Sequence, residues 1–293
     1  MAITDAIIQY RRFIKRRNYS SHTIRNYMHT LRQFILWVDA PIEQVTHATI
    51  LRYIDHLLDR RLTPKTINCH LDSIRGFYNY LIHEERVAMV HPIKRGYTLR
   101  LPHPLPRYLK DEQVAQLFAV IDNRRDRAMF MLMLRCGLRV EEVARLALTA
   151  LDLKRMQLMV CEGKGRKDRI VYISRDALQS LIDYLRVRPS TKVSKVFLVG
   201  KGSHRGKGIS VRGIQKRMEY YGRKSGVKVS CHHLRHTMAT QLLNADADLV
   251  TIQDLLGHSR IKTTQRYCKV SNLKVQRDYH KAIGEVMQRH GLP

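Results

Sequence analysis

The sequence predicts a mainly α-helical protein with one small antiparallel β-sheet, arranged as two domains. Apolar residues recur at helical spacing along most of the 293 residues. The spacing changes to an alternation of period two around residues 157–174, where two strand-like runs flank a glycine-rich turn. Residues 92–107 hold four of the eight prolines, and such a segment continues neither a helix nor a central strand. We therefore expect a helical domain at 1–91, a basic linker at 92–107 and a larger domain at 108–293.

The first domain is expected to contain only helices. Apolar residues at helical spacing predict helices within residues 7–14, 23–38 and 50–58. A fourth helix opens at Thr63-Pro64, because threonine is a favoured N-cap and proline is tolerated at the first helical position. Basic side chains interrupt the polar faces of these helices, which fits either a solvated helical bundle or a surface that binds a polyanion.

The larger domain begins with two predicted helices, at 110–121 and 125–136. The second is apolar almost all round, so we expect it to be buried. It stops at Gly137, which places Arg139 at the start of a further helix with Glu142 one turn on. These two residues could form a simple ion pair at the spacing i, i+3, or they could belong to a site.

Two runs with a period of two, at 157–161 and 169–174, predict a β-hairpin whose tip is glycine-rich and strongly basic. The remaining elements that we expect are helices at 176–187 and 210–225, a short strand at 196–199, a basic loop at 200–208 and an amphipathic tail helix at 273–288.

Three helices are expected between Cys231 and Tyr267. The first two carry apolar residues at helical spacing, and Gly257 stands where a helix C-cap would place it. Ser259 can then N-cap a third, short helix that ends on or just beyond Tyr267. The histidines and arginines of this stretch fall at helix ends or on the faces opposite the apolar ones. Cationic and imidazole groups gathered around one tyrosine suggest a phosphate site.

The net charge of +28 points to a polyanionic partner, either nucleic acid or an anionic membrane. The basic excess is spread over both predicted domains, so the folded surfaces themselves must be basic. The longest apolar run, 128–134, is far short of a membrane span. The start of the chain lacks a signal-like apolar run, and the five cysteines form no CxxC pair. We expect a cytoplasmic, nucleoid-associated protein.

Duplex DNA is therefore the expected partner, and the basic residues of three regions are candidate phosphate contacts. If the two domains grip a duplex from opposite sides, the linker must cross it with its cations toward the phosphates. The candidates are Arg25, Lys65 and Arg75 in the first domain, Lys94 and Arg95 in the linker, and Arg166 and Lys167 on the hairpin tip.

Five motifs occur in order along the chain. They are Gly137-Leu138-Arg139-x-x-Glu142, Gly163-Lys164-Gly165, His232-x-x-Arg235-His236, Leu256-Gly257-His258, and Tyr267 nine residues after that histidine. In this order and spacing the chain resembles the tyrosine recombinase (phage integrase) family, in its compact Xer-like form, over nearly its whole length. The resemblance implies a SAM-like, core-site-binding N-terminal domain followed by a catalytic domain with the DNA breaking–rejoining fold.

The residue types in these motifs suit phosphoryl transfer to a side chain. Strand cleavage that keeps the bond energy needs a covalent intermediate, and Tyr267 is the candidate nucleophile. Two bidentate guanidinium groups, Arg139 and Arg235, match the charge on the non-bridging oxygens of the transition state, and His258 could donate a further hydrogen bond. The departing 5′ oxygen needs a proton, and Lys164 is the candidate general acid.

Other roles come from the resemblance alone. It implies that His232 gives acid–base support to the tyrosine, that Glu142 orients the site, and that Lys164 rather than Lys167 is the acid. His236 is interpreted as structural more readily than as catalytic. The resemblance also implies a 3′-phosphotyrosyl link, a Holliday junction, and no metal or other cofactor. A zinc site is disfavoured because the cysteines and histidines lack paired short spacings.

By the same resemblance, four protomers act on two synapsed sites, and the protein is a monomer free in solution. The tail at 273–293 either packs into a neighbouring protomer or folds back onto its own domain. Two alternatives for function stay open at this point: a type IB topoisomerase-like enzyme that breaks strands without exchange, and a catalytically silent DNA-binding accessory protein. The role as well, whether integration, excision, inversion or dimer resolution, is left open by the sequence.

Overall fold

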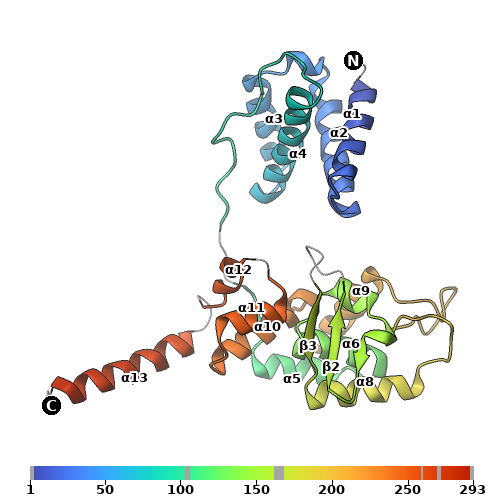
Figure 1. Cartoon of the computed structure of the whole chain (residues 1–293), viewed down its shortest axis with the longest axis vertical. Helices are drawn as coiled ribbons and strands as arrows, with labels where there is room; N and C mark the ends of the chain where they lie inside the picture. The colour runs from blue at the N-terminus through green and yellow to red at the C-terminus, as the bar shows by residue number, and fades with distance from the viewer. Residues whose placement is uncertain (1–2, 103–105, 162–167, 259, 269–271, 291–293) are drawn as a thin grey trace. The chain divides into compact units, whose positions relative to one another are not determined.

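The computed structural model describes residues 3–102, 106–161, 168–258, 260–268 and 272–290 (Figure 1). The chain divides into two compact units, unit 1 (Met1–His103) and unit 2 (Pro104–Pro293). Within the described residues, no helix combines the length and the apolar character that crossing a membrane requires.

Unit 1 is helical throughout, as predicted. Its elements are α1 (Ile3–Arg16), α2 (Ser21–Val38), the short 3-10 turn η1 (Ile42–Gln44), α3 (His47–Asp59) and α4 (Pro64–His83). Helix α3 starts three residues before the expected position, because the Thr46 side chain caps it. Thr63 caps α4, with Pro64 at its first position, as the sequence indicated.

The core of unit 1 is rich in aromatic residues and centres on α4. Phe77 of α4 packs edge-on against Tyr10 of α1, with 5.4 Å between ring centroids, and both side chains are buried. The segment after α4 is also tied to this unit. The Asn68 amide donates to the Leu99 carbonyl at 2.9 Å and accepts from the Leu99 N–H at 2.8 Å. Part of the proline-containing stretch therefore packs against unit 1.

Unit 2 combines helices with a three-stranded antiparallel sheet of order β1-β2-β3. The strands are β1 (Leu151–Asp152), β2 (Gln157–Val160) and β3 (Arg169–Tyr172), and a 3-10 turn, η2 (Leu148–Ala150), precedes them. The helices are α5 (Asp111–Ala119), α6 (Arg124–Arg135), α7 (Val140–Arg145), α8 (Arg175–Val187), α9 (Val211–Ser225), α10 (Cys231–Asn244), α11 (Leu249–Leu256), α12 (Ile261–Gln265) and α13 (Asn272–His290).

The sheet buries one face, as its period of two predicted. Leu158 of β2 lies opposite Val171 of β3, and both side chains are buried, whereas Ile170 and Tyr172 of β3 face outward. The prediction of a strand at 196–199 was wrong. Within this segment, Leu198 makes an isolated bridge to Gly208.

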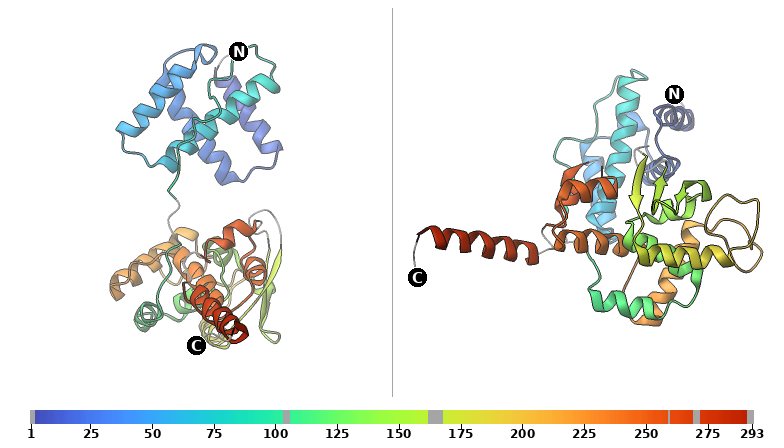
Figure 2. Two further views of the ribbon diagram at one scale, coloured as in Figure 1. Left: turned by 90° about the vertical axis from the view of Figure 1, so that its left-hand side faces the viewer. Right: turned by 60° about the horizontal axis from the view of Figure 1, so that its bottom comes forward.

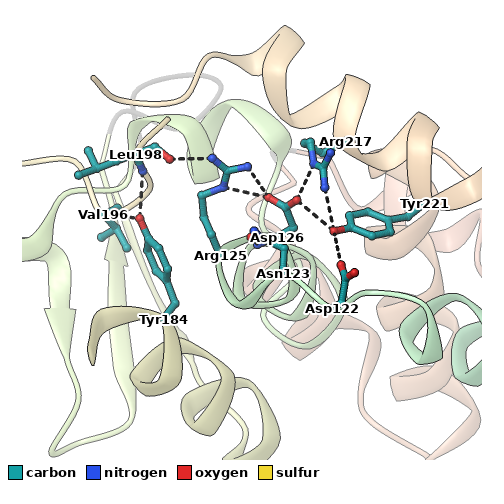
Figure 3. A network of polar contacts seen from close by, with 9 residues as sticks. All are labelled: Asp122, Asn123, Arg125, Asp126, Tyr184, Val196, Leu198, Arg217 and Tyr221. Carbon is teal, nitrogen blue, oxygen red and sulfur yellow. Dashed lines mark hydrogen bonds and ion pairs between the residues drawn. The ribbon is translucent and has the colours of Figure 1, made fainter. Parts of the chain in front are cut away.

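A buried carboxylate fixes one end of unit 2 (Figure 3). Asp126 of α6 has no exposed surface, and it accepts hydrogen bonds from Arg125 and, at 2.6 Å, from Arg217 Nε of α9. Arg125 also donates to the Leu198 carbonyl at 2.8 Å, so the network joins α6, α9 and the segment before the basic loop. Tyr221 completes it, because its hydroxyl reaches Asp126 at 3.3 Å. Two guanidinium groups thus compensate the charge of Asp126.

The last helices form a second, smaller core beside the sheet. Helix α11 packs against both α10 and α12, and it also contacts β3 (Figure 1). Buried apolar residues join α10 to α11, and Tyr267, just after α12, belongs to the same cluster. Helix α13 extends away from the rest of unit 2 in Figure 1 and in the right-hand view of Figure 2, while Arg277 of α13 donates to the Asn244 carbonyl at the end of α10. Three of its apolar side chains are exposed: Tyr279, Val286 and Met287.

Candidate active site

Gly137 shapes the turn that delivers Arg139. Its φ is +64°, a left-handed conformation that glycine adopts without strain. A Cβ atom there would lie 3.0 Å from Leu256 and 3.1 Å from the sulfur of Met238, so this turn passes directly over α10 and α11. Arg139 then occupies the N-cap position of α7. The long apolar helix α6 therefore ends so that an arginine is presented beside the small core.

Glu142 lies between two arginines. It accepts from the backbone N–H of Arg139 at 2.7 Å and from Arg139 Nη1 at 2.8 Å. The guanidinium of Arg169 approaches both carboxylate oxygens at 2.9 Å. Burial alone would raise the pKa of this carboxyl group, but the hydrogen bonds and charges of Arg169 and Arg139 outweigh that effect and lower the pKa to about 2. Glu142 is therefore ionised at any physiological pH.

Arg235 is the most deeply buried cation of the site, with 1% of its surface exposed. Its Nη1 donates to the Gly137 carbonyl, and its Nη2 donates to the Leu256 carbonyl. Burial and the charge of Arg139 lower the pKa of this guanidinium to about 9. Among the described residues, no carboxylate forms an ion pair with it. A buried cation held by neutral carbonyls alone is costly, and an anionic ligand would offset that cost.

His258 follows the left-handed C-cap Gly257, whose φ is +59°. Its Nδ1 lies 2.9 Å from the hydroxyl of Thr264 on α12, and the Thr264 carbonyl accepts from the N–H of Tyr267 at 2.9 Å. Burial, followed by the charges of Arg235 and Arg139, lowers the pKa of His258 to about 4. The imidazole is therefore neutral at pH 7.

Tyr267 is 2% exposed, and its hydroxyl lies 2.7 Å from Nδ1 of His236. Burial raises the pKa of the phenol above its ordinary value, and the charges of Arg235, Arg266 and Arg139 offset only part of this increase. Burial also lowers the pKa of His236, and nearby imidazoles and arginines lower it further, to about 3. The neutral imidazole and the protonated phenol thus form a complementary hydrogen-bonded pair.

His232 lies one turn before His236 on α10, and its ring meets the His236 ring edge-on with 4.1 Å between centroids. Its residue surface is exposed. Partial desolvation and the charges of Arg235 and other nearby groups lower the pKa of His232. The imidazole that contacts the Tyr267 hydroxyl is thus that of His236, and His232 contacts the His236 ring.

The structure brings together most of the residues that the motifs selected. They are Arg139, Glu142, His232, Arg235, His236, His258 and Tyr267. Lys164, Arg166 and Lys167 lie outside the described residues. Of the candidate DNA contacts, Arg25, Lys65, Lys94 and Arg95 are exposed on unit 1, and Arg75 is half-buried with an ion pair to Asp72 at 2.7 Å.

Sequence reasoning missed Arg169 and Thr264. The signal for Arg169 was present in the alternation of β3, because Arg169 shares the inward face with the buried Val171. An arginine at an inward position of a half-buried strand needs an acidic partner to compensate its buried charge, and Glu142 is that partner. Thr264 had no comparable signal, since a threonine in a short helix is ordinary.

Among the described residues, His/Cys/Asp/Glu side chains form no group of three that could hold a metal ion. The site can instead bind an oxyanion. Arg139, Arg169 and Arg235 bring three positive charges against the one negative charge of Glu142, next to a tyrosine that could act as a nucleophile.

The sequence has clear relatives. Residues 107–274 match the Phage integrase family, and residues 7–86 match the Phage integrase N-terminal SAM-like domain. Tyrosine recombinase XerA of Thermococcus kodakarensis is 31% identical over 287 residues, which cover 97% of this chain and 98% of that protein. Tyrosine recombinase XerC of Actinobacillus succinogenes is 34% identical over 279 residues, covering 90% and 92%.

Solved structures show the same fold. The integrase of transposon Tn1549, in complex with transposon right-end DNA, aligns with a TM-score of 0.77 at 17% identity, over 95% of this chain and 99% of that chain. The crystal structure of XerA recombinase aligns with a TM-score of 0.53 at 24% identity, over 99% of both chains. The predicted fold class, a SAM-like helical domain plus a mainly helical catalytic domain with a small antiparallel sheet, is confirmed.

Proposed function

This chain belongs to the phage integrase family and is a tyrosine-type site-specific recombinase, and we propose that Tyr267 is its nucleophile. On this proposal, Arg139, Arg235 and His258 bind the DNA phosphate that Tyr267 attacks. The observation that carries it is the burial of Arg235, whose two recorded partners are the carbonyls of Gly137 and Leu256. A buried guanidinium without an ion-pair partner among the described residues, in the same cluster as a tyrosine, is suited to a phosphodiester.

The negative charge on the phosphate in the transition state explains why two arginines are needed. A phosphodiester carries one negative charge, and the pentavalent transition state places further charge on the non-bridging oxygens. Arg139 uses Nη1 for Glu142, and its Nη2 makes a 3.3 Å contact with the Gly257 carbonyl, which leaves donors of the fork for phosphate. Its side chain is 24% exposed, against 7% for Glu142, so the arginine and not the carboxylate faces the incoming DNA.

His258 contributes a neutral donor. We assign the hydroxyl of Thr264 as the donor to Nδ1 of His258, which places the imidazole proton on Nε2. That tautomer can donate to a non-bridging oxygen without adding charge. Since the Thr264 carbonyl also accepts from the N–H of Tyr267, one residue of α12 aligns the donor and the nucleophile.

The reaction is then a direct exchange of one phosphate ester for another. As the phenol oxygen of Tyr267 bonds to phosphorus, its proton passes to an imidazole, which is the acid–base role that the family resemblance gives to His232. The bond from phosphorus to the 5′ oxygen breaks, and that oxygen takes up a proton. Lys164, by resemblance to the family, is the group that gives it. The product is a 3′-phosphotyrosyl link and a free 5′-hydroxyl, which attacks the partner strand and leads to a Holliday junction. His236 orients the phenol, and His232 gives acid–base support beside it.

Duplex DNA is the partner of the reaction. The high net charge of +28 supports extended phosphate contacts from Arg25, Lys65, Arg75, Lys94, Arg95, Arg166 and Lys167. We assign a cytoplasmic, nucleoid-associated location on the same grounds. Four protomers act on two synapsed core sites, and the free protein is a monomer. The exposed apolar side chains of α13 support packing of this helix into a neighbouring protomer.

Strand exchange between two distinguishable duplexes tests this function. The DNA probe is a duplex recovered by selection from a random-sequence library on the purified protein, placed once in each of two plasmids of different size. A recombinase joins the two plasmids into recombinant products. Relaxation of supercoils without recombinants would instead indicate a topoisomerase-like enzyme, and binding without either product would indicate a silent accessory protein.

A further inference from the structure

We propose that Arg169 is a positioning residue for catalysis: it holds the carboxylate of Glu142 so that Arg139 keeps its charge and its donors for the phosphate. This inference rests on the proposed function of the site. Arg169 is the first residue of β3 and does not belong to the five motifs named above. It touches neither Tyr267 nor the proposed phosphate donors through any hydrogen bond that the structure records, so it acts through Glu142.

The guanidinium of Arg169 holds Glu142 and the end of α11 through three hydrogen bonds. Nη1 and Nη2 each lie 2.9 Å from a different oxygen of Glu142, which is a bidentate fork. The third donor, Nε, reaches the carbonyl of Leu255 at 2.9 Å, close to the end of α11. The side chain is only 10% exposed, against 24% for Arg139. Arg169 thus holds the carboxylate from the more buried side, and Arg139 contacts it from the side nearer the solvent.

This arrangement decides what Glu142 can do to Arg139. Each carboxylate oxygen already has two donors: Oε1 accepts from one nitrogen of each arginine, and Oε2 accepts from Arg169 and from the backbone of Arg139. Glu142 therefore takes a single N–H of the Arg139 guanidinium instead of forming its own fork with it. Without Arg169, the carboxylate could turn and form a bidentate pair with Arg139, which would occupy the donors intended for phosphate.

The same conclusion follows from charge. With Arg169 present, one guanidinium balances the Glu142 carboxylate, and the charges of Arg139 and Arg235 remain for the phosphate. With Arg169 replaced by a neutral side chain, Glu142 balances Arg139 instead. The transition state, which carries more negative charge than the ground state, would then lose more stabilisation than the bound substrate.

A close packing contact supports this assignment independently. A Cβ atom on Gly257 would lie 3.0 Å from Cδ and 3.2 Å from Nη1 of Arg169. The backbone that carries His258 therefore lies directly on the Arg169 side chain. The Gly257 carbonyl also faces Nη2 of Arg139 at 3.3 Å. Arg169 thus supports, in one place, the elements that present Arg139 and His258.

The test measures single-turnover cleavage of the selected duplex, nicked beside the cleavage position so that the covalent adduct accumulates. The variants are Arg169→Met, Arg169→Lys and the double variant Arg169→Met with Glu142→Gln. The matched control is Arg155→Met, at an exposed arginine just before β2. Each protein is assayed on a phosphodiester and on a methylphosphonate at the scissile position, since the neutral methylphosphonate needs less charge stabilisation.

We expect Arg169→Met to slow phosphodiester cleavage by about 100-fold, with DNA affinity nearly unchanged and a much smaller loss on the methylphosphonate. Arg169→Lys keeps the charge but not the fork, so its loss should be intermediate and equally selective. The double variant should cleave faster than Arg169→Met, because no carboxylate then remains to neutralise Arg139. Where Arg169→Met fails to fold, the substrate selectivity of Arg169→Lys and the double variant decides.

Equal losses on both substrates, a double variant no faster than the single one, or wild-type rates in Arg169→Met would each overturn the inference. Failure of the proposed function is distinguishable, because the wild-type protein would then form no adduct on either substrate.

Discussion

Nδ1 of His236 lies 2.7 Å from the hydroxyl oxygen of Tyr267, and this contact fixes the position of the proposed nucleophile. The tyrosine is 2% exposed, so its hydroxyl has little access to water as an alternative partner. A pKa of about 3 makes His236 a weak base, while the pKa of the phenol is raised. The imidazole therefore orients the phenol and does not deprotonate it in the free protein.

Replacing His236 should slow formation of the covalent adduct without changing DNA affinity. In His236→Ala the buried hydroxyl loses its partner, so we expect about tenfold slower adduct formation and a loss of about 1–2 kcal/mol in the free energy of unfolding. His236→Asn should recover most of both, because the asparagine Oδ1 can accept where Nδ1 did. Single-turnover trapping and urea unfolding measure the two effects. Wild-type rates in His236→Ala would show that His236 does not position Tyr267 for the reaction.

Arg235 should matter for cleavage and hardly at all for stability. Arg235→Met keeps much of the side-chain volume and removes a buried cation that has no ion-pair partner among the described residues. This gain offsets the cost of leaving the Gly137 and Leu256 carbonyls without their donor, so the free energy of unfolding should stay within about 1 kcal/mol. Cleavage should fall by about 10³-fold, because a donor fork to the phosphate is lost. Arg235→Lys should rescue little, since an ammonium cannot form the fork. A large loss of stability in Arg235→Met would contradict the assignment of this arginine as a phosphate ligand.

Replacing the buried carboxylate of Asp126, in contrast to replacing Arg235, should strongly reduce stability. Asp126→Asn leaves Arg125 and Arg217 without their counter-charge, so we expect a loss of about 3–5 kcal/mol in the free energy of unfolding. The matched control is Asp152→Asn, whose 3.9 Å contact with Arg155 is exposed and should contribute less than about 1 kcal/mol. Urea unfolding monitored by circular dichroism compares them. Similar values for the two variants would show that the network in Figure 3 contributes little.

Stability should decline on acidification below about pH 6.5. The pKa values of His232, His236 and His258 lie below 6.5 in the folded protein, so the unfolded chain takes up these protons first as the pH falls. Below about pH 4.5 a second loss begins, because the Glu142 pKa of about 2 makes its ionised form a stabilising one. Urea unfolding at each half pH unit measures the curve. The double variant His236→Asn with His258→Asn should flatten the curve between pH 6.5 and 4. An unchanged slope would show that the pKa values of these two histidines are not lowered by folding.

Much of this fold follows from local sequence signals. The helices were predicted because apolar spacing and caps such as Thr63-Pro64 act within a few residues. The turn at Gly137 and the C-cap at Gly257 were placed correctly for the same reason. The segment 196–199 was assigned wrongly, because its pairing depends on residues such as Gly208 that a local pattern does not select. Ser259, the expected cap of the third helix, lies outside the described residues, and α12 ends at Gln265, before Tyr267.

The site was less accessible to sequence reasoning than the fold. Its motif residues were found through their order and spacing, but their partners depend on tertiary contacts. Arg169 reaches Glu142 across 27 residues of sequence, and His236 reaches Tyr267 across 31. The geometry adds that His236, not His232, contacts the phenol.

The most direct measurement is the identity of the residue that becomes linked to DNA. The nicked duplex traps the adduct, and mass spectrometry of the digested protein locates the phosphotyrosine. We expect the label on the peptide that contains Tyr267, no adduct from Tyr267→Phe, and a normal yield from the matched control Tyr172→Phe, whose ring is exposed on β3. An adduct formed by Tyr267→Phe, or a label on another residue of the wild-type protein, would contradict the central claim.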